Sequence, residues 1–129
     1  MQPMVLVIEP EPMLRRTMTK FLQSSGYGTT ACPDTDAAIG AVRSAPPQLI
    51  VLAVRVLDAD ALAATRRLRQ AVNGIPILGV ADAADLPGGA VLPDQVRFLA
   101  PPFDLPDLLR AVRSSLRQSQ ATPTLELEA

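Results

Sequence analysis

The chain has 129 residues, of which 48% are hydrophobic and 19% charged, and its net charge is −1. This length suits one domain with its own core, and the composition is that of a globular protein and not of a disordered one. The charge and the 3% of aromatic residues offer neither a basic surface nor a stacking platform for nucleic acid, so nucleic-acid binding is the weakest reading of the chain.

The reactive residue types are few. There is no histidine, which excludes imidazole ligands and histidine-based catalysis, and Cys32 is a single cysteine without a partner for an intramolecular disulfide. No signal peptide is visible, and no apolar run reaches the roughly 20 residues that span a bilayer. We therefore expect a cytoplasmic domain without a membrane segment, a metal cluster or a cofactor.

Apolar strands alternate with helix-length segments along the chain, which predicts an α/β fold with a parallel sheet. Helix starts are expected near Glu11–Pro12 and Pro33–Asp36, where proline or an acid suits the first turn. The expected strands are 4–8, 27–32, 48–53, 75–80 and a short run at Phe98; the expected helices lie between them and at about 60–72 and 105–117. Residues 1–117 are predicted to form the domain, and residues 118–129 a disordered C-terminal tail.

The ends of these strands carry the most informative residues. The run Val5–Glu11 leads into an acidic turn, and the later runs are Leu49–Ala53, Ile75–Ala81 and Phe98–Phe103. This succession resembles the CheY-like receiver domain of bacterial two-component response regulators over about residues 4 to 117. The resemblance implies a flavodoxin-like (βα)5 three-layer sandwich around a parallel five-stranded sheet of order 2-1-3-4-5.

The same resemblance indicates that the phosphorylation pocket is degenerate. Receivers carry an acid pair after the first strand, an aspartate ending the third, a threonine or serine ending the fourth and Lys-Pro ending the fifth. The matching positions here are Glu9, Pro10, Ala53, Ala81 and Pro101. Nucleophile, metal ligand, hydroxyl and cation are therefore lost together, and Lys20, the only lysine, falls in the first helix. We expect a pseudo-receiver that binds magnesium weakly or not at all and is not an enzyme.

Other features implied by the resemblance are less complete. Phe98 matches the aromatic residue that reports activation in receivers. An aromatic residue that is simply partly buried in a strand explains Phe98 at least as well. Pro102 follows Pro101 where receivers commonly have a cis peptide bond. Between the fourth and fifth strands, two prolines and a glycine pair leave at most one or two turns of helix, so the family's fourth helix is predicted to be shortened or irregular.

With its pocket degenerate, such a domain would act by docking to a signalling protein such as a histidine kinase or another regulator, as a monomer or weak homodimer. Candidate docking residues are Leu57, Arg97, Arg110 and Arg113. Leu57 stands in a loop after the third strand, where receivers often have proline.

Two alternatives remain open at this point. One is a receiver that accepts a phosphoryl group on another acid, Asp58 or Glu9, although Asp58 and Asp60 suit capping of the third helix better. The other is a flavodoxin-like enzyme or small-ligand binder, but no glycine-rich phosphate loop follows the first strand.

Overall fold

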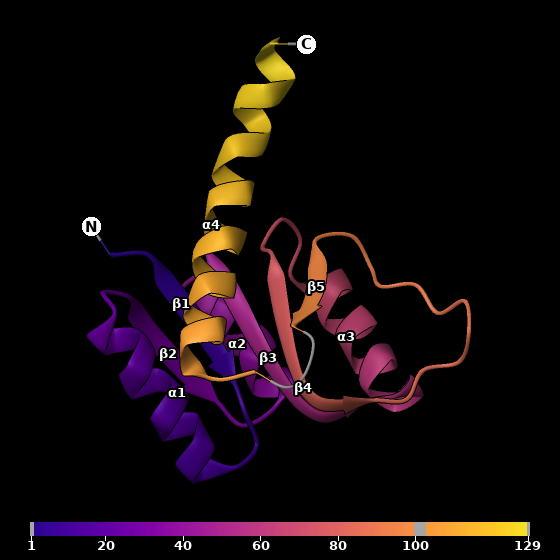
Figure 1. Ribbon diagram of the computed structural model, residues 1–129. Coiled ribbons are helices and arrows are strands. Elements are labelled where there is room, and N and C mark those ends of the chain that lie inside the picture. The colour runs from indigo at the N-terminus through magenta and orange to yellow at the C-terminus, as the bar shows by residue number, and fades with distance from the viewer. Residues whose placement is uncertain (1, 100–102, 129) are drawn as a thin grey trace.

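A parallel five-stranded sheet lies at the centre of the computed structural model, which describes residues 2–99 and 103–128, with side chains described to residue 118 (Figure 1). The strand order is β2-β1-β3-β4-β5, as predicted. In chain order the elements are β1 (Met4–Ile8), α1 (Pro12–Ser24), β2 (Gly28–Cys32), α2 (Thr35–Ser44), β3 (Leu49–Leu57), α3 (Ala59–Ala71), β4 (Ile77–Ala84), β5 (Val96–Leu99) and α4 (Leu105–Glu128).

Apolar side chains cover both faces of the sheet, because successive side chains of a strand point to opposite sides. On one face, Val7, Val51 and Val80 pack with residues of α1 and α4. On the other, Ile8 and Leu52 pack with residues of α2 and α3. The molecule is therefore the predicted three-layer sandwich, with a core on each side of the sheet.

All four described helices begin at an acidic residue whose side chain accepts a hydrogen bond from a backbone N–H of the first turn. The caps are Glu11 for α1, Asp34 for α2, Asp58 for α3 and Asp104 for α4. Such caps satisfy N–H groups that have no partner within the helix. Capping by Asp58 was predicted, and the distance from the Ala61 nitrogen to its carboxylate is 2.9 Å.

The two central strands are longer than predicted. β3 continues past Ala53 to Leu57 and β4 continues past Val80 to Ala84, so the predicted loop after the third strand is instead paired strand. The register pairs Val54 with Ala81 and Leu57 with Ala84. The reason lies in the sequence, since Val54 and Val56 favour strands and neither glycine nor proline follows to end β3.

No helix connects β4 to β5. Residues 85–95, all of which the structure describes, form turns and irregular chain, so the segment predicted to be a shortened or irregular helix is irregular throughout. Pro87 and Pro93 disfavour a helix, and Gly89 adopts a positive φ of 84° that ends regular structure.

The last helix is also longer than predicted. We expected it to end near Arg117 and residues 118–129 to be disordered, but α4 continues to Glu128 and projects beyond the sheet (Figure 1). Residues 118–122 contain neither glycine nor proline, so an established helix can extend through them, whereas its continuation past Pro123 has no explanation in the sequence. The buried side chains described in α4 are Leu108, Ala111, Val112, Ser115 and Leu116. The division of the chain at residue 117 stays a prediction.

Over the described residues, no helix combines the length and the apolar character needed to cross a membrane.

Candidate functional site

Three charged side chains lie on the same face of the sheet, near the carboxyl ends of three neighbouring strands. Each lies two residues beyond a core position of its strand: Glu9 follows Val7, Arg55 follows Ala53 and Asp82 follows Val80. Because residues two apart in a strand share a face, all three point to the side of the sheet that α1 and α4 cover. Arg55 and Asp82 lie between the register pairs Val54–Ala81 and Val56–Ala83.

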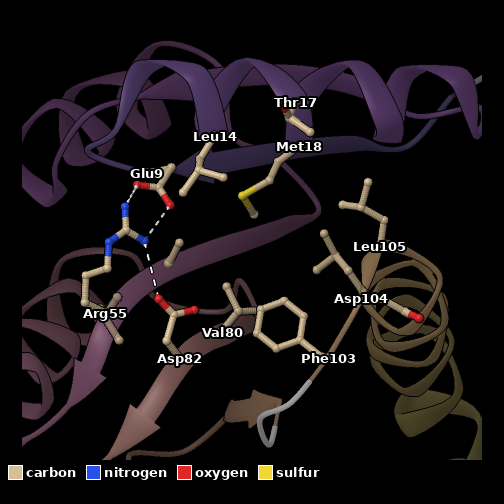
Figure 2. Close-up of a pocket in the computed structure, with 13 residues that line it drawn as sticks. Glu9, Leu14, Thr17, Met18, Arg55, Val80, Asp82, Phe103, Asp104 and Leu105 are labelled. Atoms are coloured by element: carbon tan, nitrogen blue, oxygen red, sulfur yellow. Dashed lines mark hydrogen bonds and ion pairs between the residues drawn. The ribbon is translucent and has the colours of Figure 1, made fainter.

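The Arg55 guanidinium links the two acids, as Figure 2 shows. Its Nη2 lies 3.4 Å from Oε2 of Glu9, and its Nη1 lies 3.5 Å from Oε1 of the same carboxylate. Nη1 also lies 3.9 Å from Oδ2 of Asp82. The Glu9 side chain is only 2% exposed, whereas the Arg55 side chain is 52% exposed. Arg55 therefore supplies a positive charge to a buried carboxylate.

The turn after β1 adds hydrogen bonds around Glu9. The Glu11 N–H donates to Oε2 of Glu9 over 2.8 Å, and Nη1 of Arg15 donates to the Glu9 carbonyl oxygen over 2.8 Å. The Leu14 N–H donates to the Glu11 carboxylate, and this bond is the main reason that the pKa of Glu11 lies below its usual value, with Arg55 and Arg15 contributing through their charges. The turn is thus held by hydrogen bonds to two carboxylates, and that of Glu11 is stabilised in its ionised form.

A pocket of about 260 Å³ lies beside this ion pair. Its apolar wall comes from α1, β3, β4 and the start of α4, and the charged groups Glu9, Arg55, Asp82 and Asp104 also line it. Figure 2 shows Leu14 and Met18 above the pocket and Val80 and Phe103 below it. The lining includes Thr17, Ala53, Val54, Leu105 and Leu108 as well.

The structure brings together only some of the residues predicted for a degenerate phosphorylation pocket. Glu9 and Ala53 both line the pocket. Pro10 is exposed beside it, and Ala81 is buried but does not belong to the lining, which takes Val80 and Asp82 from the same strand. Pro101 and the predicted cis-proline Pro102 lie outside the described residues. Ala53 stands within β3 and not at its end.

Magnesium, which the receiver resemblance implies, does not fit the side chains present here. The ion prefers several carboxylate, carbonyl and water oxygens in octahedral geometry. Ala53 and Pro10 offer no side-chain oxygen, and the carboxylates of Glu9 and Asp82 already share a guanidinium. Over the residues that the structure describes, no three Asp, Glu, Cys or His side chains are grouped so as to hold a metal ion.

The predicted switch aromatic, Phe98, lies on the other face of the sheet from the ion pair. It is partly buried and packs against the core formed with α2 and α3. Its ring covers Gly79 so closely that a Cβ placed there would lie 2.3 Å from Phe98 Cε2.

The predicted docking residues differ in whether they are exposed. The prediction for Leu57 is wrong, because this residue ends β3 with only 6% of its surface exposed and has no exposed apolar side chain to offer. Arg97, Arg110 and Arg113 are exposed. Arg97 donates to Ser115, and Arg110 forms an ion pair with Asp107. Their docking role stays a prediction.

Sequence reasoning missed Arg55, the residue that changes the chemistry of the site most. The signal was available: Arg55 stands two residues after Ala53 and therefore on the same strand face. We assigned Arg55 to a loop, where side-chain direction cannot be inferred from alternation. Asp82 was missed as a partner for the same reason.

Known proteins share the sequence features of this chain. A family model described as the response regulator receiver domain matches residues 5–113. The probable transcriptional regulatory protein TcrX of Mycobacterium tuberculosis is 28% identical over 120 residues, covering 92% of this chain and 51% of that protein. The response regulator MprA of Mycolicibacterium vanbaalenii is 30% identical over 122 residues, covering 89% of this chain and 51% of that protein. The chain thus spans about half the length of these relatives.

Solved structures show the same fold. The signal receiver domain of a putative Luxo repressor protein from Vibrio parahaemolyticus superimposes with a TM-score of 0.70 at 18% identity, covering 98% of both chains. A CheY-like receiver domain protein from Methanospirillum hungatei gives a TM-score of 0.71 at 11% identity, covering 93% of this chain and 98% of that one. With the family match over most of its length, this chain belongs to the response regulator receiver domain family.

Proposed function

We propose that this receiver domain works without being phosphorylated, as a module that docks to another protein of a two-component pathway. The observation that carries the proposal is the contact between Arg55 and the buried carboxylate of Glu9, in a pocket where Ala53 takes the phosphoacceptor position. The protein's own guanidinium stands against the acid that would otherwise help to hold a divalent cation.

The chemistry of phosphoryl transfer supports this reading. Transfer to a carboxylate needs a nucleophilic oxygen, and charge on the phosphoryl oxygens must be neutralised by a cation. Ala53 has no such oxygen, and Glu9 is engaged by Arg55 and by the Glu11 N–H. Asp58 is occupied as the cap of α3 and is not part of the pocket lining. We therefore propose that magnesium binds weakly or not at all and that the domain catalyses no reaction.

The proposed partner is a protein. Receiver domains interact with histidine kinases and other regulators, and the family assignment brings this chain into such a pathway. The exposed arginines Arg97, Arg110 and Arg113 are candidates for the contact. The net charge of −1 gives no support to direct nucleic-acid binding by this chain.

The test is to incubate the protein with a small phosphodonor and magnesium and to measure intact mass. A receiver domain with a complete pocket serves as the positive control for the donor. We expect the control to gain a phosphoryl group and this chain to remain unmodified. Stoichiometric phosphate that hydroxylamine removes would overturn the proposal, and peptide mapping would then assign it to Glu9, Asp58 or Asp82.

A further inference from the structure

The pocket beside Arg55 has a mostly apolar lining that the proposed docking role does not use. Met18, Val80 and Leu108 belong both to its lining and to the core between the sheet and the helices α1 and α4. Leu14, which is 43% exposed, stands on α1 above the pocket (Figure 2). At about 260 Å³, the pocket is slightly smaller than the usual range for drug-sized ligands, which begins at about 300 Å³. The pocket can hold a ligand no larger than one aromatic ring with a short alkyl chain.

The charges that line the pocket favour a cation. Three carboxylates line the pocket: Glu9 directly after β1, Asp82 in β4 and Asp104 directly before α4. One guanidinium lines it, that of Arg55 in β3, and a second, that of Arg15, lies nearby at the Glu9 carbonyl oxygen. The α1 lining adds no charge, and the Thr17 hydroxyl donates to its own helix at Met13. Acids therefore outnumber bases at the pocket, and an anionic ligand would be repelled.

The contacts between Arg55 and the buried carboxylate of Glu9 are long. Charge-assisted N–H···O bonds are usually about 2.7–2.9 Å long. The Arg55 contacts of Glu9 are longer, at 3.4 Å for Oε2 and 3.5 Å for Oε1. An ammonium group is more compact than a guanidinium and carries its charge on one atom. It could therefore approach Glu9 more closely than Arg55 does, with Asp82 on its other side.

We infer that this pocket binds a small amphipathic amine, with its ring against Met18, Val80 and Leu108 and its ammonium group at the carboxylates of Glu9 and Asp82. The Arg55 side chain is half exposed, so its guanidinium can turn toward solvent and one cationic group replaces another at the carboxylates. Magnesium cannot make the same exchange, because the side chains of Ala53 and Pro10 still offer it no oxygen ligand. The inference depends on the pocket and its charges and is independent of whether the domain is phosphorylated.

The test compares three probes with the same ring and different charge: phenethylamine, phenethyl alcohol and phenylpropionate. Each is titrated into the labelled full chain at neutral pH and constant ionic strength, with amide NMR shifts as the readout. We expect phenethylamine to shift Glu9, Ala53, Arg55, Val80 and Leu105 saturably, with Kd on the order of 1 mM. It should bind about tenfold more tightly than the alcohol, and the anion more weakly still.

Variants separate the pocket from general charge effects. Asp82→Asn should weaken the binding of phenethylamine about threefold or more and leave the affinity for phenethyl alcohol unchanged. Asp36→Asn is the matched control, because Asp36 is an exposed acid paired with Arg67 and lies outside the pocket lining. Leu14→Trp should weaken the binding of all three probes, because the larger side chain fills the entrance of the pocket.

Equal affinity for the three probes, or no saturable shift of the pocket amides by phenethylamine, would overturn the inference. The inference would also be overturned if Asp82→Asn and Asp36→Asn changed the affinity for phenethylamine equally, or if magnesium alone shifted the pocket amides. Failure of this inference would leave the phosphodonor result untouched, so the two proposals fail separately.

Discussion

The Arg55 guanidinium lies 3.4 Å from the Glu9 carboxylate, which is almost fully buried at the end of β1. A buried carboxylate is unfavourable unless a charge or hydrogen bonds compensate it. In this domain the compensation comes from the polypeptide itself, from β3 and from the Glu11 N–H. Arg55 thus places a cation of the protein itself beside the buried acid.

Removal of Arg55 should destabilise the fold. We expect Arg55→Met to lower the free energy of unfolding by about 1–2 kcal/mol, less than for a fully buried pair because Arg55 is half exposed. Adding Glu9→Gln should restore most of the loss, since the uncompensated charge is then gone. Urea unfolding of the two single variants and the double variant measures the coupling.

The matched control for that cycle is Arg67→Met, which breaks the exposed pair with Asp36. An exposed ion pair contributes about 1 kcal/mol or less, so this change should have a small effect. If Arg55→Met were no more destabilising than Arg67→Met, Arg55 would not be compensating a buried charge.

Restoring the acid of the family should not restore magnesium binding while Arg55 is present. Ala53 is 6% exposed, so Ala53→Asp should destabilise the protein by about 2 kcal/mol or more, and the uncharged Ala53→Asn by less. Millimolar magnesium should raise the Tm of Ala53→Asp combined with Arg55→Met, but not that of the natural protein. Stabilisation of the natural protein by magnesium would contradict the account.

The Glu11 cap predicts a dependence of stability on pH. Its pKa is lowered in the folded protein, first by the Leu14 N–H, so the ionised form stabilises the fold. This contribution is present above the usual glutamate pKa of about 4.3 and is lost as the pH falls from there through the folded pKa. Glu11→Gln should flatten the stability profile in that acidic range, as measured by urea unfolding at several pH values.

A residual slope in the Glu11→Gln variant is expected from Asp107, whose pKa is lowered mainly by the Asp104 N–H. The combined variant Glu11→Gln and Asp107→Asn should therefore be flatter than either alone. An unchanged slope in all three would show that these caps do not control acid stability.

The close contact of Gly79 with Phe98 gives a prediction about packing. Gly79→Ala places a methyl group 2.3–2.5 Å from three ring atoms of Phe98 and should cost about 1–3 kcal/mol. In a Phe98→Ala background the same substitution should cost much less. Gly40→Ala is the control: nothing lies within 4 Å of its new methyl group, and α2 should gain up to about 1 kcal/mol. Equal effects at the two glycines in thermal unfolding would refute the contact.

The parts of the fold that the sequence predicted are those governed by periodicity. Runs such as Leu49–Ala53 indicated buried strands, while the strand order rested on the receiver resemblance. The ends of β3 and β4 were less predictable because no glycine or proline follows Ala53 or Val80 within either strand. That error in strand length hid Arg55, whose direction follows from alternation only if Arg55 lies in a strand.

The long α4 was missed for a different reason. Residues after Arg117 contain Thr122 and Pro123, which are poor helix formers, so local propensity favoured a disordered tail. In the structure the helix is already established by the packing of Leu108, Val112 and Leu116 and extends to Glu128. Tertiary packing at one end of a helix is not visible in the local sequence of the other.

The most direct test of the central claim is an amide NMR titration of the natural protein with magnesium and beryllofluoride, which mimics an aspartyl phosphate. We predict that the resonances of Glu9, Ala53, Arg55 and Ala81 stay unchanged, because Arg55 engages the Glu9 carboxylate and Ala53 has no side-chain oxygen to offer. Saturable shifts at these residues would contradict the account and would show that the pocket still accepts a phosphoryl group.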